Sequence, residues 1–506
     1  MSPGVPAPHV VVVGGGIAGL AAAHALATDA QARAAGIACT LIEADDRVGG
    51  KLRTEVIDGC LVECGPDAFL ATKPWARDLC VALGLQDRLV STRPGRGVYV
   101  AYRGKLRRLP DGLALGIPTR PLALVRAGLL SPADALRAAA DLVLPRRRAA
   151  DDESIGRLLR RRLGAATADR LVGPLLAGIY AGDAEALSVR ATFPQLCEWE
   201  RHYRSLILAG LAQSRRRAAA PRTAPSAAGP APQRQVVPTG DSGVFLSLAG
   251  GMGELVDALL ASVRDRVQVL RGVAVAQLVA PGGPQPVYTL RLEDGRVLRA
   301  DGLVLAAPAF VAADLLAPLC PAAAAALRAV PYASTAAVTL AYRREAVAHP
   351  LDGHGFVVAR GEPLAITACT WVSSKWPDRA PPDTVLLRCF LGRAGADAIV
   401  AADDATLVET ARRDLRAVMG LDAVPRLVHV VRWPRAMPQY VPGHLARLSA
   451  IEAALAGLPR LALAGAGYRG IGVPDCIRQG QEAAARVLAA LVAHSGAAPV
   501  PVTPTR

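Results

Sequence analysis

Residues 9–50 read HVVVVGGGIAGLAAAHALATDAQARAAGIACTLIEADDRVGG, and this stretch decides the fold. It opens with four valines, Val10–Val13, whose β-branched side chains predict a buried strand. The Ala- and Leu-rich segment 20–27 predicts a helix, and Cys39–Ile42 predicts a second strand. The order of strand, glycine-rich turn, helix and strand predicts a βαβ unit that binds a dinucleotide.

Three glycines and one acidic residue carry the ligand-binding prediction. Gly14, Gly16 and Gly19 stand in G-x-G-x-x-G spacing, and Glu43 follows the second strand. The first glycine allows a tight turn, the second lets the backbone approach a pyrophosphate, and the third lets the helix lie close to the strand. The helix N-terminus offers unpaired N–H groups to the phosphates, and Glu43 can accept hydrogen bonds from the ribose hydroxyls. The alternative is an ordinary glycine-rich turn beside an exposed Glu43.

Length and charge limit the function classes. The 506 residues are enough for two or three domains, and 52% of them are hydrophobic, so a large core needs no disulfides. The net charge of +15 favours an anionic partner, either a polycarboxylate substrate or an anionic membrane surface, or is simply a solvated basic surface. No nucleic-acid motif accompanies the charge, so we expect no nucleic acid partner.

Nine scattered cysteines without a C-x-x-C pair are typical of a protein in a reducing compartment. Cys60 and Cys64 lie close together, but no histidine lies near them in the sequence. We therefore interpret both as core residues and expect no metal. The sequence contains no signal peptide and no run of about 18 apolar residues. We expect a cytoplasmic protein, with peripheral contact to the inner face of the cell membrane as an open alternative.

The remaining chain alternates between strands, helices and one flexible loop. The segment 54–62 predicts an edge strand, followed by a turn at Gly65-Pro66. Residues 111–212 are largely helical, and 213–241 have the Ala-, Pro- and Arg-rich composition of a flexible loop. Further elements are expected in this order: helix 74–83, hairpin 98–109, helix 247–263, strand 267–278, hairpin 287–299, strands 301–309, 332–342 and 364–371, and helix 404–419.

A second glycine-rich turn lies near the end of the chain. Four glycines fall within eight residues, between a strand expected at 461–464 and a last helix that begins at 473–475. An ordinary chain reversal is the alternative, but so many glycines ahead of a helix indicate a backbone in close contact with a ligand. These glycines are Gly465, Gly467, Gly470 and Gly472.

The residues after Glu43 narrow the cofactor. Arg47, Gly49, Gly50 and Lys51 continue the first unit, and this R-x-G-G-K run resembles the flavin amine oxidase superfamily. In that superfamily the run wraps the pyrophosphate of FAD, whereas NAD-dependent dehydrogenases do not normally carry it. The resemblance therefore implies FAD as the cofactor.

The same resemblance assigns further residues and an architecture. It implies that the turn at Gly65 lies close to the isoalloxazine ring and that Val273 lies against the adenine. It also implies that the flavin-binding loop and helix near the end of the chain include Gly465, Val473 and Asp475. It implies an α/β fold with a Rossmann-like FAD-binding domain of the GR2 type, a mixed-sheet substrate domain and an inserted helical domain. The expected ranges are 1–95, 242–310 and 441–506 for the FAD-binding domain, 96–212 for the substrate and helical domain, which is a candidate membrane-facing part, 213–241 for the insertion, and 311–440 for the substrate-domain sheet and helices.

Four segments together resemble a narrower family, the oxygen-dependent porphyrinogen oxidases, which are FAD enzymes of haem synthesis. The segments are GPDAFLATKPWA (65–76), GPLLAGIYAGDAEALSVRATFPQL (173–196), AITACTWVSSKWP (365–377) and AGAGYRGIGVPDCIRQG (464–480). The resemblance implies hydride transfer from a porphyrinogen ring carbon to the flavin, followed by reduction of O2 to hydrogen peroxide. ITACTWVSSKWP and RWPRAMPQY (432–440) favour coproporphyrinogen III as the substrate, with protoporphyrinogen IX as the alternative.

Two substrate residues follow from this resemblance. It implies that the carbonyl of Gly178 orients a pyrrole N–H and that Arg96 binds a propionate, the alternative for Arg96 being a solvated loop arginine. It assigns no catalytic acid or base to the protein. The competing functions are an amine oxidase, a carotenoid desaturase and a non-catalytic FAD-binding scaffold. A monomer and a homodimer both fit the sequence, and a downstream haem-pathway enzyme is a candidate partner.

Overall fold

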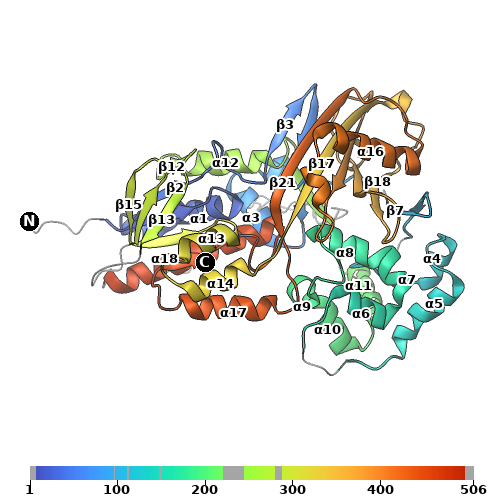
Figure 1. Ribbon diagram of the computed structural model, residues 1–506, viewed down its shortest axis with the longest axis horizontal. Helices are drawn as coiled ribbons and strands as arrows, with labels where there is room; N and C mark the ends of the chain where they lie inside the picture. Colours follow the sequence, from blue (N-terminus) through green and yellow to red (C-terminus); the bar gives the residue numbers. More distant parts are fainter. Residues whose placement is uncertain are drawn as a thin grey trace, which may run out of the picture.

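The computed structural model describes residues 7–95, 97–110, 113–147, 151–219, 244–279 and 288–495. The chain forms three parts (Figure 1): a sheet with its helices on the left, a second, larger sheet at the upper right, and a group of helices at the lower right. Arg96 and residues 220–241 of the expected loop lie outside the described residues. The first part of that loop is helical instead, because α11 (Leu206–Ala219) continues to Ala219.

The valines of β1 (His9–Val13) form the centre of a five-stranded parallel sheet, as predicted. The strand order is β12-β2-β1-β16-β22, and every neighbouring pair is parallel. Because the strands share one direction, their carboxyl ends meet at one edge, where open parallel sheets bind their ligands. The other strands are β2 (Ala38–Ile42), β12 (Val267–Leu270), β16 (Gly302–Leu305) and β22 (Leu461–Leu463).

Alternate side chains of β1 are buried in two different layers, as the period of two in a strand requires. Val10 and Val12 pack among three helices, whereas Val11 and Val13 pack beneath a three-stranded antiparallel sheet and three further helices. The first layer consists of α1 (Ile17–Thr28), α12 (Gly253–Val263) and α18 (Val473–Ser495). The second consists of β13 (Val275–Val279), β14 (Tyr288–Leu292), β15 (Val297–Ala300), α13 (Ala309–Leu316), α14 (Pro321–Arg328) and α17 (His444–Leu455).

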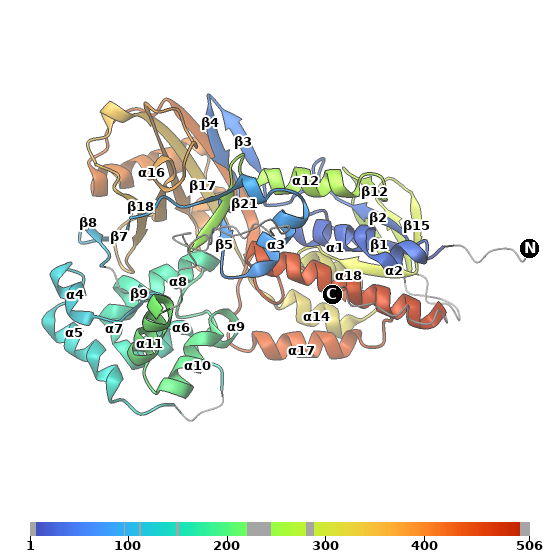
Figure 2. The same ribbon diagram turned by 180° about the vertical axis from the view of Figure 1, so that it is seen from behind.

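The first and last long helices lie side by side, which Figure 2 shows from behind. A Cβ atom on Gly480 of α18 would lie 2.1 Å from the carbonyl oxygen of Ala18 in α1. Only glycine permits this approach, since side-chain carbons do not come so close to backbone oxygens. The contact joins the two ends of the chain in one layer.

The second sheet has seven strands in the order β21-β17-β20-β19-β18-β7-β8. It is mixed, because β18 and β7 pair in parallel while the other neighbours are antiparallel. Helix α16 (Asp404–Met419), with the bounds predicted from the sequence, covers one of its faces. The strands are β7 (Gly97–Tyr102), β8 (Lys105–Arg108), β17 (Tyr332–Arg343), β18 (Gly353–Val358), β19 (Ile366–Trp371), β20 (Thr384–Leu391) and β21 (Leu427–Pro438).

The predicted helical region is a bundle around its own apolar core. Inside it, the buried guanidinium of Arg162 donates to Oδ1 of Asp141 at 2.5 Å and to backbone carbonyls. Within the described ranges, no helix combines the length and apolar character that a membrane span requires. The helices of eight residues or more are α5 (Pro132–Ala139), α6 (Ile155–Leu163), α8 (Gly173–Tyr180), α10 (Pro194–Tyr203) and α11, with the shorter α4 (Pro121–Arg126), α7 (Ala165–Thr167) and α9 (Val189–Thr192) between them.

Three sequence expectations were wrong in detail. The helix expected at 247–263 is shorter, because residues 247 and 248 end the strand β11 (Phe245–Leu248) and α12 begins only at Gly253. The segment 54–62 is not one edge strand but a hairpin, β3 (Thr54–Ile57) and β4 (Cys60–Glu63), because Asp58 and Gly59 take positive φ values of 48° and 74° and turn the chain. The expected strand 267–278 is likewise two strands, β12 and β13, in different sheets. In the segments 54–62 and 267–278, apolar residues on either side hid a short polar or glycine-containing turn.

Candidate functional site

The two glycine-rich turns meet at the carboxyl edge of the parallel sheet. Gly14 has φ +104°, and a Cβ atom there would lie 2.9 Å from the carbonyl carbon of Ala306, the residue after β16. Gly465 has φ +125°, and a Cβ atom there would lie 3.8 Å from the carbonyl oxygen of the same Ala306. The first turn and the last therefore lie next to one backbone unit, at the edge where open parallel sheets bind their ligands.

The start of α1 leaves room and hydrogen-bond donors for an anion. Gly16 is the N-cap of α1, no side chain caps its N–H groups, and no acidic residue lies in its first turn. A Cβ atom on Gly16 would meet no other atom within 4 Å, so the space in front of it is open. These features fit the pyrophosphate of FAD, because its charge is stabilised by unpaired amides at a helix N-terminus.

The R-x-G-G run lies directly against this turn. The backbone N–H of Gly49 donates to the carbonyl of Gly15 at 2.8 Å, and a Cβ atom on Gly50 would lie 3.2 Å from Cα of Gly16. Arg47 does not point freely into the crevice, since its guanidinium donates to the carbonyls of Gly50 and Val48. Its role here is to hold the shape of the loop.

Lys51 brings a cation to the same region. Burial lowers the pKa of its ammonium, and among the described residues none forms a hydrogen bond or ion pair with it. Its backbone lies beside the next turn, because a Cβ atom on Gly65 would overlap the carbonyl oxygen of Lys51 at 1.7 Å. An unpaired, half-buried ammonium next to an open helix N-terminus fits a phosphate-bearing cofactor.

Glu43 and Val273 lie together on the other side of the crevice. The N–H of Val273 donates to the carbonyl of Glu43 at 3.2 Å, and the Val273 side chain is buried. The Glu43 carboxylate accepts from the N–H of Gly15 at 2.5 Å and from that of Asp45 at 2.9 Å. A carboxylate has about four acceptor sites, so Glu43 keeps lone pairs for ribose hydroxyls.

The last helix enters the site with an ion pair that the sequence did not predict. Both oxygens of Asp475 accept from Nζ of Lys73, at 2.8 and 2.5 Å, so this carboxylate is engaged within the protein. A Cβ atom on Gly470 would lie 2.6 Å from Cγ of Asp475, and Val473 is buried beside them. The pair fixes the start of α18 and the glycine turn before it.

The turn at Gly65 is held by the second sheet. Arg388 donates to the carbonyl of Gly65 at 2.6 Å, and Trp433 donates to the carbonyl of Cys64 at 2.7 Å. Asp67 accepts from Lys375 at 2.8 Å. Burial alone would raise the pKa of Asp67, but the cations of Lys375 and Arg388 outweigh it and hold that pKa well below its usual range.

Tyr440 connects the last glycine turn to the helical bundle. Its hydroxyl donates to the carbonyl of Ala466 at 2.6 Å and accepts from the N–H of Gly470 at 2.9 Å. Its ring stacks on His444 with centroids 3.9 Å apart and lies 5.6 Å from the ring of Tyr180 in α8. In the sequence Tyr440 is only the last residue of the segment 432–440, because nothing in the local pattern shows these long-range contacts.

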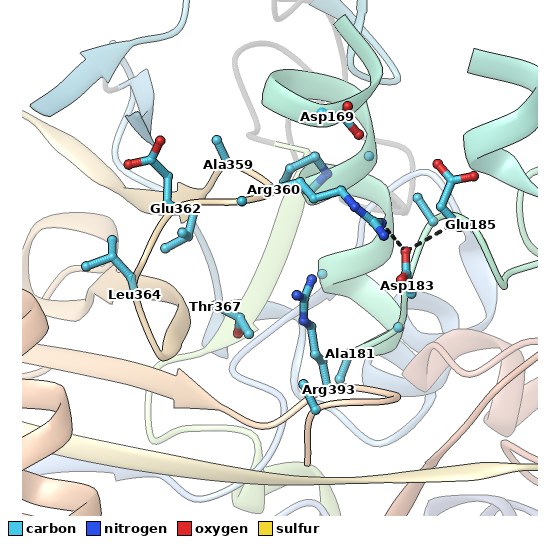
Figure 3. A pocket seen from close by; sticks show the side chains of 18 of the residues that line it. Asp169, Ala181, Asp183, Glu185, Ala359, Arg360, Glu362, Leu364, Thr367 and Arg393 are labelled. Carbon is cyan, nitrogen blue, oxygen red and sulfur yellow. Dashed lines mark hydrogen bonds and ion pairs between the residues drawn. The ribbon is translucent and has the colours of Figure 1, made fainter. Parts of the chain in front are cut away.

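A cavity of about 320 Å³ lies between the helical bundle and the second sheet (Figure 3). Gly178, in α8, is exposed at its wall, and a Cβ atom on this residue would meet open space. Arg360 donates to Asp183 at 2.5 Å, and the Arg393 side chain extends into the same cavity (Figure 3). The Arg393 guanidinium makes no hydrogen bond or ion pair with any residue that the structure describes, which leaves a cation available at the cavity.

Comparison with known proteins identifies what these features resemble. The family of flavin-containing amine oxidoreductases matches residues 17–488. The coproporphyrinogen III oxidase of Bacillus subtilis is 38% identical over 481 residues, which are 95% of this chain and 98% of that protein. The coproporphyrinogen III oxidase of Propionibacterium freudenreichii is also 38% identical, over 97% of this chain and 93% of that protein.

More distant matches extend the comparison. Protoporphyrinogen oxidase 1 of Arabidopsis thaliana chloroplasts is 31% identical over 94% of this chain and 87% of that protein. A crystal structure from Exiguobacterium sp., provisionally assigned as a protoporphyrinogen oxidase, has a TM-score of 0.82 and 32% identity, covering 96% of this chain and all of that one. Cyclohexylamine oxidase of Brevibacterium oxydans, at TM-score 0.66 and 20% identity, shares the fold.

Proposed function

The chain belongs to the family of flavin-containing amine oxidoreductases, and we propose that it oxidises coproporphyrinogen III to coproporphyrin III in haem synthesis. The family match confirms the α/β flavoprotein fold, the FAD cofactor and the oxidoreductase activity expected from the sequence. The observation that carries the proposed substrate is the 38% identity, over nearly the whole chain, to the coproporphyrinogen III oxidases of two bacteria. The protoporphyrinogen oxidase of a chloroplast is less similar, at 31% identity.

Bound FAD would supply the redox chemistry, in which each two-electron oxidation of the porphyrinogen ring reduces one O2 to hydrogen peroxide, and repeated rounds would yield the porphyrin. The protein binds and orients both molecules. The amides at the start of α1 and the Lys51 ammonium stabilise the pyrophosphate, while Glu43 holds the ribose and Val273 covers the adenine. Gly65 and the turn from Gly465 are the segments that would hold the isoalloxazine ring, as the family resemblance implies.

The porphyrinogen occupies the space between α8 and the second sheet. Gly178 is exposed there, and its carbonyl accepts only one long hydrogen bond, from the N–H of Ala181 at 3.3 Å. A carbonyl oxygen has two lone pairs, so the second can orient a pyrrole N–H of the substrate. Coproporphyrinogen III carries four propionates, and Arg393 at the cavity is an unpaired cation for one of them. Arg96, the propionate residue expected from the sequence, lies outside the described residues. No protein acid or base is assigned, since the hydride acceptor is the flavin itself.

Peripheral membrane contact is the second part of the proposal, and its support lies at the outer end of the helical bundle. Figure 2 shows α4 and α5 at that end. Leu122, Leu136 and Val143 are 70%, 75% and 81% exposed there, with exposed Arg126 and Arg146 beside them. Exposed leucines flanked by arginines favour an anionic lipid surface. Sedimentation with anionic vesicles tests this contact, and equal sedimentation with neutral and anionic vesicles would contradict it.

Parallel assays with both porphyrinogens test the proposed reaction. Purified protein should be yellow, should consume O2 and release peroxide with coproporphyrinogen III, and should have a higher kcat/KM for it than for protoporphyrinogen IX. A higher kcat/KM for protoporphyrinogen IX would make that molecule the substrate instead. Turnover of neither porphyrinogen would contradict the proposed reaction. Gel filtration of the same sample distinguishes a monomer from a homodimer.

A further inference from the structure

A cysteine, a histidine and a glutamate meet beside the Gly65 turn, outside the residues assigned to flavin or substrate. Sγ of Cys64 lies 3.7 Å from Nε2 of His429 and 3.5 Å from Oε1 of Glu55. Nε2 of His429 lies 3.5 Å from Oε2 of Glu55. In the part of the chain that the structure describes, this is the one group of three or more such side chains whose candidate ligand atoms all lie within 4.8 Å of one another.

We propose that Cys64, His429 and Glu55 bind a Zn²⁺ ion. Tetrahedral zinc has bonds of about 2.3 Å to sulfur and about 2.0–2.2 Å to nitrogen and oxygen. Those bond lengths place neighbouring ligand atoms roughly 3.4–3.6 Å apart. The separations of 3.7 Å between Sγ and Nε2 and of 3.5 Å between Nε2 and Oε2 are close to these values. Sγ lies 3.5 Å from the other oxygen, Oε1, and one atom from each side chain brings all three within 4.8 Å of one another, so a rotation of the Glu55 carboxylate completes the site. Water takes the fourth position.

The three ligands come from segments that the fold holds rigidly together. Glu55 is on β3, Cys64 directly follows β4, and His429 is on β21. Figure 1 shows the β3 hairpin next to β21. The backbone of Cys64 is fixed on both sides, since its N–H donates to the carbonyl of Arg53 at 2.8 Å and its carbonyl accepts from Trp433 at 2.7 Å. Rigid elements of this kind hold a metal site to the required precision.

Charge and exposure also suit the ion. A Cys64 thiolate and a Glu55 carboxylate together balance its two positive charges, and a neutral His429 supplies the third ligand. Binding exchanges the thiol proton of Cys64, which leaves to solvent, for the Zn–S bond. The side chains of Glu55 and His429 are 25% and 21% exposed, so the ion enters from solvent, while Cys64 is fully buried. A thiolate and an imidazole select zinc over magnesium or calcium, which prefer oxygen ligands.

Arg53 has a supporting part in this site. Its guanidinium forms an ion pair with Oε1 of Glu55, which leaves Oε2, the oxygen nearer His429, for the ion. In the sequence no histidine lies near Cys64, so the site could not be expected there. The packing of the β3 hairpin beside β21 supplies the missing ligand. Cys64 is fully buried, as expected of a core residue, and the proposal adds a ligand role to it.

Occupation of the site should stabilise the turn that leads to Gly65. The ion ties the β3–β4 hairpin to the second sheet immediately before the residue whose carbonyl accepts from Arg388. A ligand that binds only the folded protein raises its unfolding temperature in proportion to the logarithm of ligand concentration. Zinc should therefore raise the Tm of the holoenzyme, and this readout does not depend on its activity or substrate.

The test uses FAD-loaded full-length protein that has been stripped of metal with a chelator. Titration with ZnCl2 should show a single bound equivalent and a rise in Tm. Cobalt(II) in its place should give a thiolate-to-metal absorption band in the difference spectrum. His429→Gln should weaken zinc binding by at least about tenfold and Cys64→Ser should remove the cobalt band. His202→Gln and Cys197→Ser, which change a histidine and a cysteine in α10, should bind as the wild type does.

The two ligand variants differ in how far they could disturb folding, so that a loss of zinc binding can be told apart from a failure to fold. Cys64 is buried, so its variant is compared by circular dichroism and flavin content, whereas His429 is half-buried and its replacement leaves the core intact. Zinc uptake by His429→Gln with the affinity of the wild type would overturn the proposal. So would a wild-type protein that takes up no zinc, whatever its oxidase activity.

Discussion

A Cβ atom on Gly19 would lie 1.8 Å from the carbonyl oxygen of Gly14, so these two glycines hold α1 against the turn after β1. Gly19→Ala must therefore push the helix away from the sheet. We expect a loss of about 1–3 kcal/mol in the free energy of unfolding, together with loss of flavin. Urea denaturation followed by circular dichroism measures the first, and the flavin-to-protein absorbance ratio measures the second. A variant as stable as the wild type would show that the helix adjusts freely.

Gly16→Val should separate cofactor binding from folding. No atom lies within 4 Å of a Cβ built at this position, and the backbone there is extended, so the protein itself accommodates the side chain. The open space is the one that we assign to the pyrophosphate. We expect a folded, colourless protein with at least about a tenfold weaker affinity for FAD, measured by fluorescence titration of the apoprotein. Full flavin content after purification would place the pyrophosphate elsewhere.

The helical bundle depends on a buried ion pair. Asp141 is fully buried and accepts from Nε of Arg162 at 2.5 Å, from the hydroxyl of Ser205 at 2.6 Å and from the N–H of Ile207 at 2.9 Å. Asp141→Ala leaves the buried guanidinium of Arg162 without its carboxylate, which should cost about 3–5 kcal/mol. Limited proteolysis of the bundle and thermal unfolding monitor this loss. Asp265→Ala, which removes an exposed partner of Arg264, is the control and should change the Tm little.

The sequence predicted best what is decided by neighbours in the chain. The βαβ unit at the N-terminus follows from valines, glycines and alanines within residues 9–42, and α16 follows from its own amphipathic pattern. The hairpin of β3 and β4 was misread, because its two-residue turn at Asp58-Gly59 interrupts an alternating pattern without changing its period.

Contacts between distant segments could not be predicted from the sequence. Lys73 pairs with Asp475, and Cys64 meets His429, although each pair is separated by most of the chain. Ala306, between the two glycine turns, is an unremarkable residue in its local sequence, and its position is known only once β1, β16 and β22 are placed side by side. The sites at these meeting points depend on topology, which local patterns do not encode.

The carboxylate of Asp67 should make stability depend on acid pH. Its pKa in the folded protein lies below the ordinary value of about 3.9, so its ion pair with Lys375 is fully present above that value. The stabilisation is lost as the pH falls from about 4 toward the lowered folded pKa. Between pH 6 and 3 the Tm of the wild type should fall more steeply than that of Asp67→Asn. Parallel Tm curves for the two proteins would show that Asp67 gains no stability from these cations.

Arg393 is the cation that we expect one substrate propionate to meet. The residue lines the cavity beside Gly178 and has no acidic partner of its own among the described residues, so Arg393→Gln should leave the fold intact. An anchoring contact formed equally in the ground state and the transition state raises KM and leaves kcat unchanged. We expect this pattern with coproporphyrinogen III, with a rise in KM of about tenfold, the effect of losing one charge-assisted hydrogen bond.

Arg96→Ala should raise the KM in the same way if the family resemblance holds for Arg96. Arg266→Gln, which changes an exposed arginine that does not line the cavity, is the matched control, and an unchanged KM in Arg393→Gln would exclude this cavity from the substrate site.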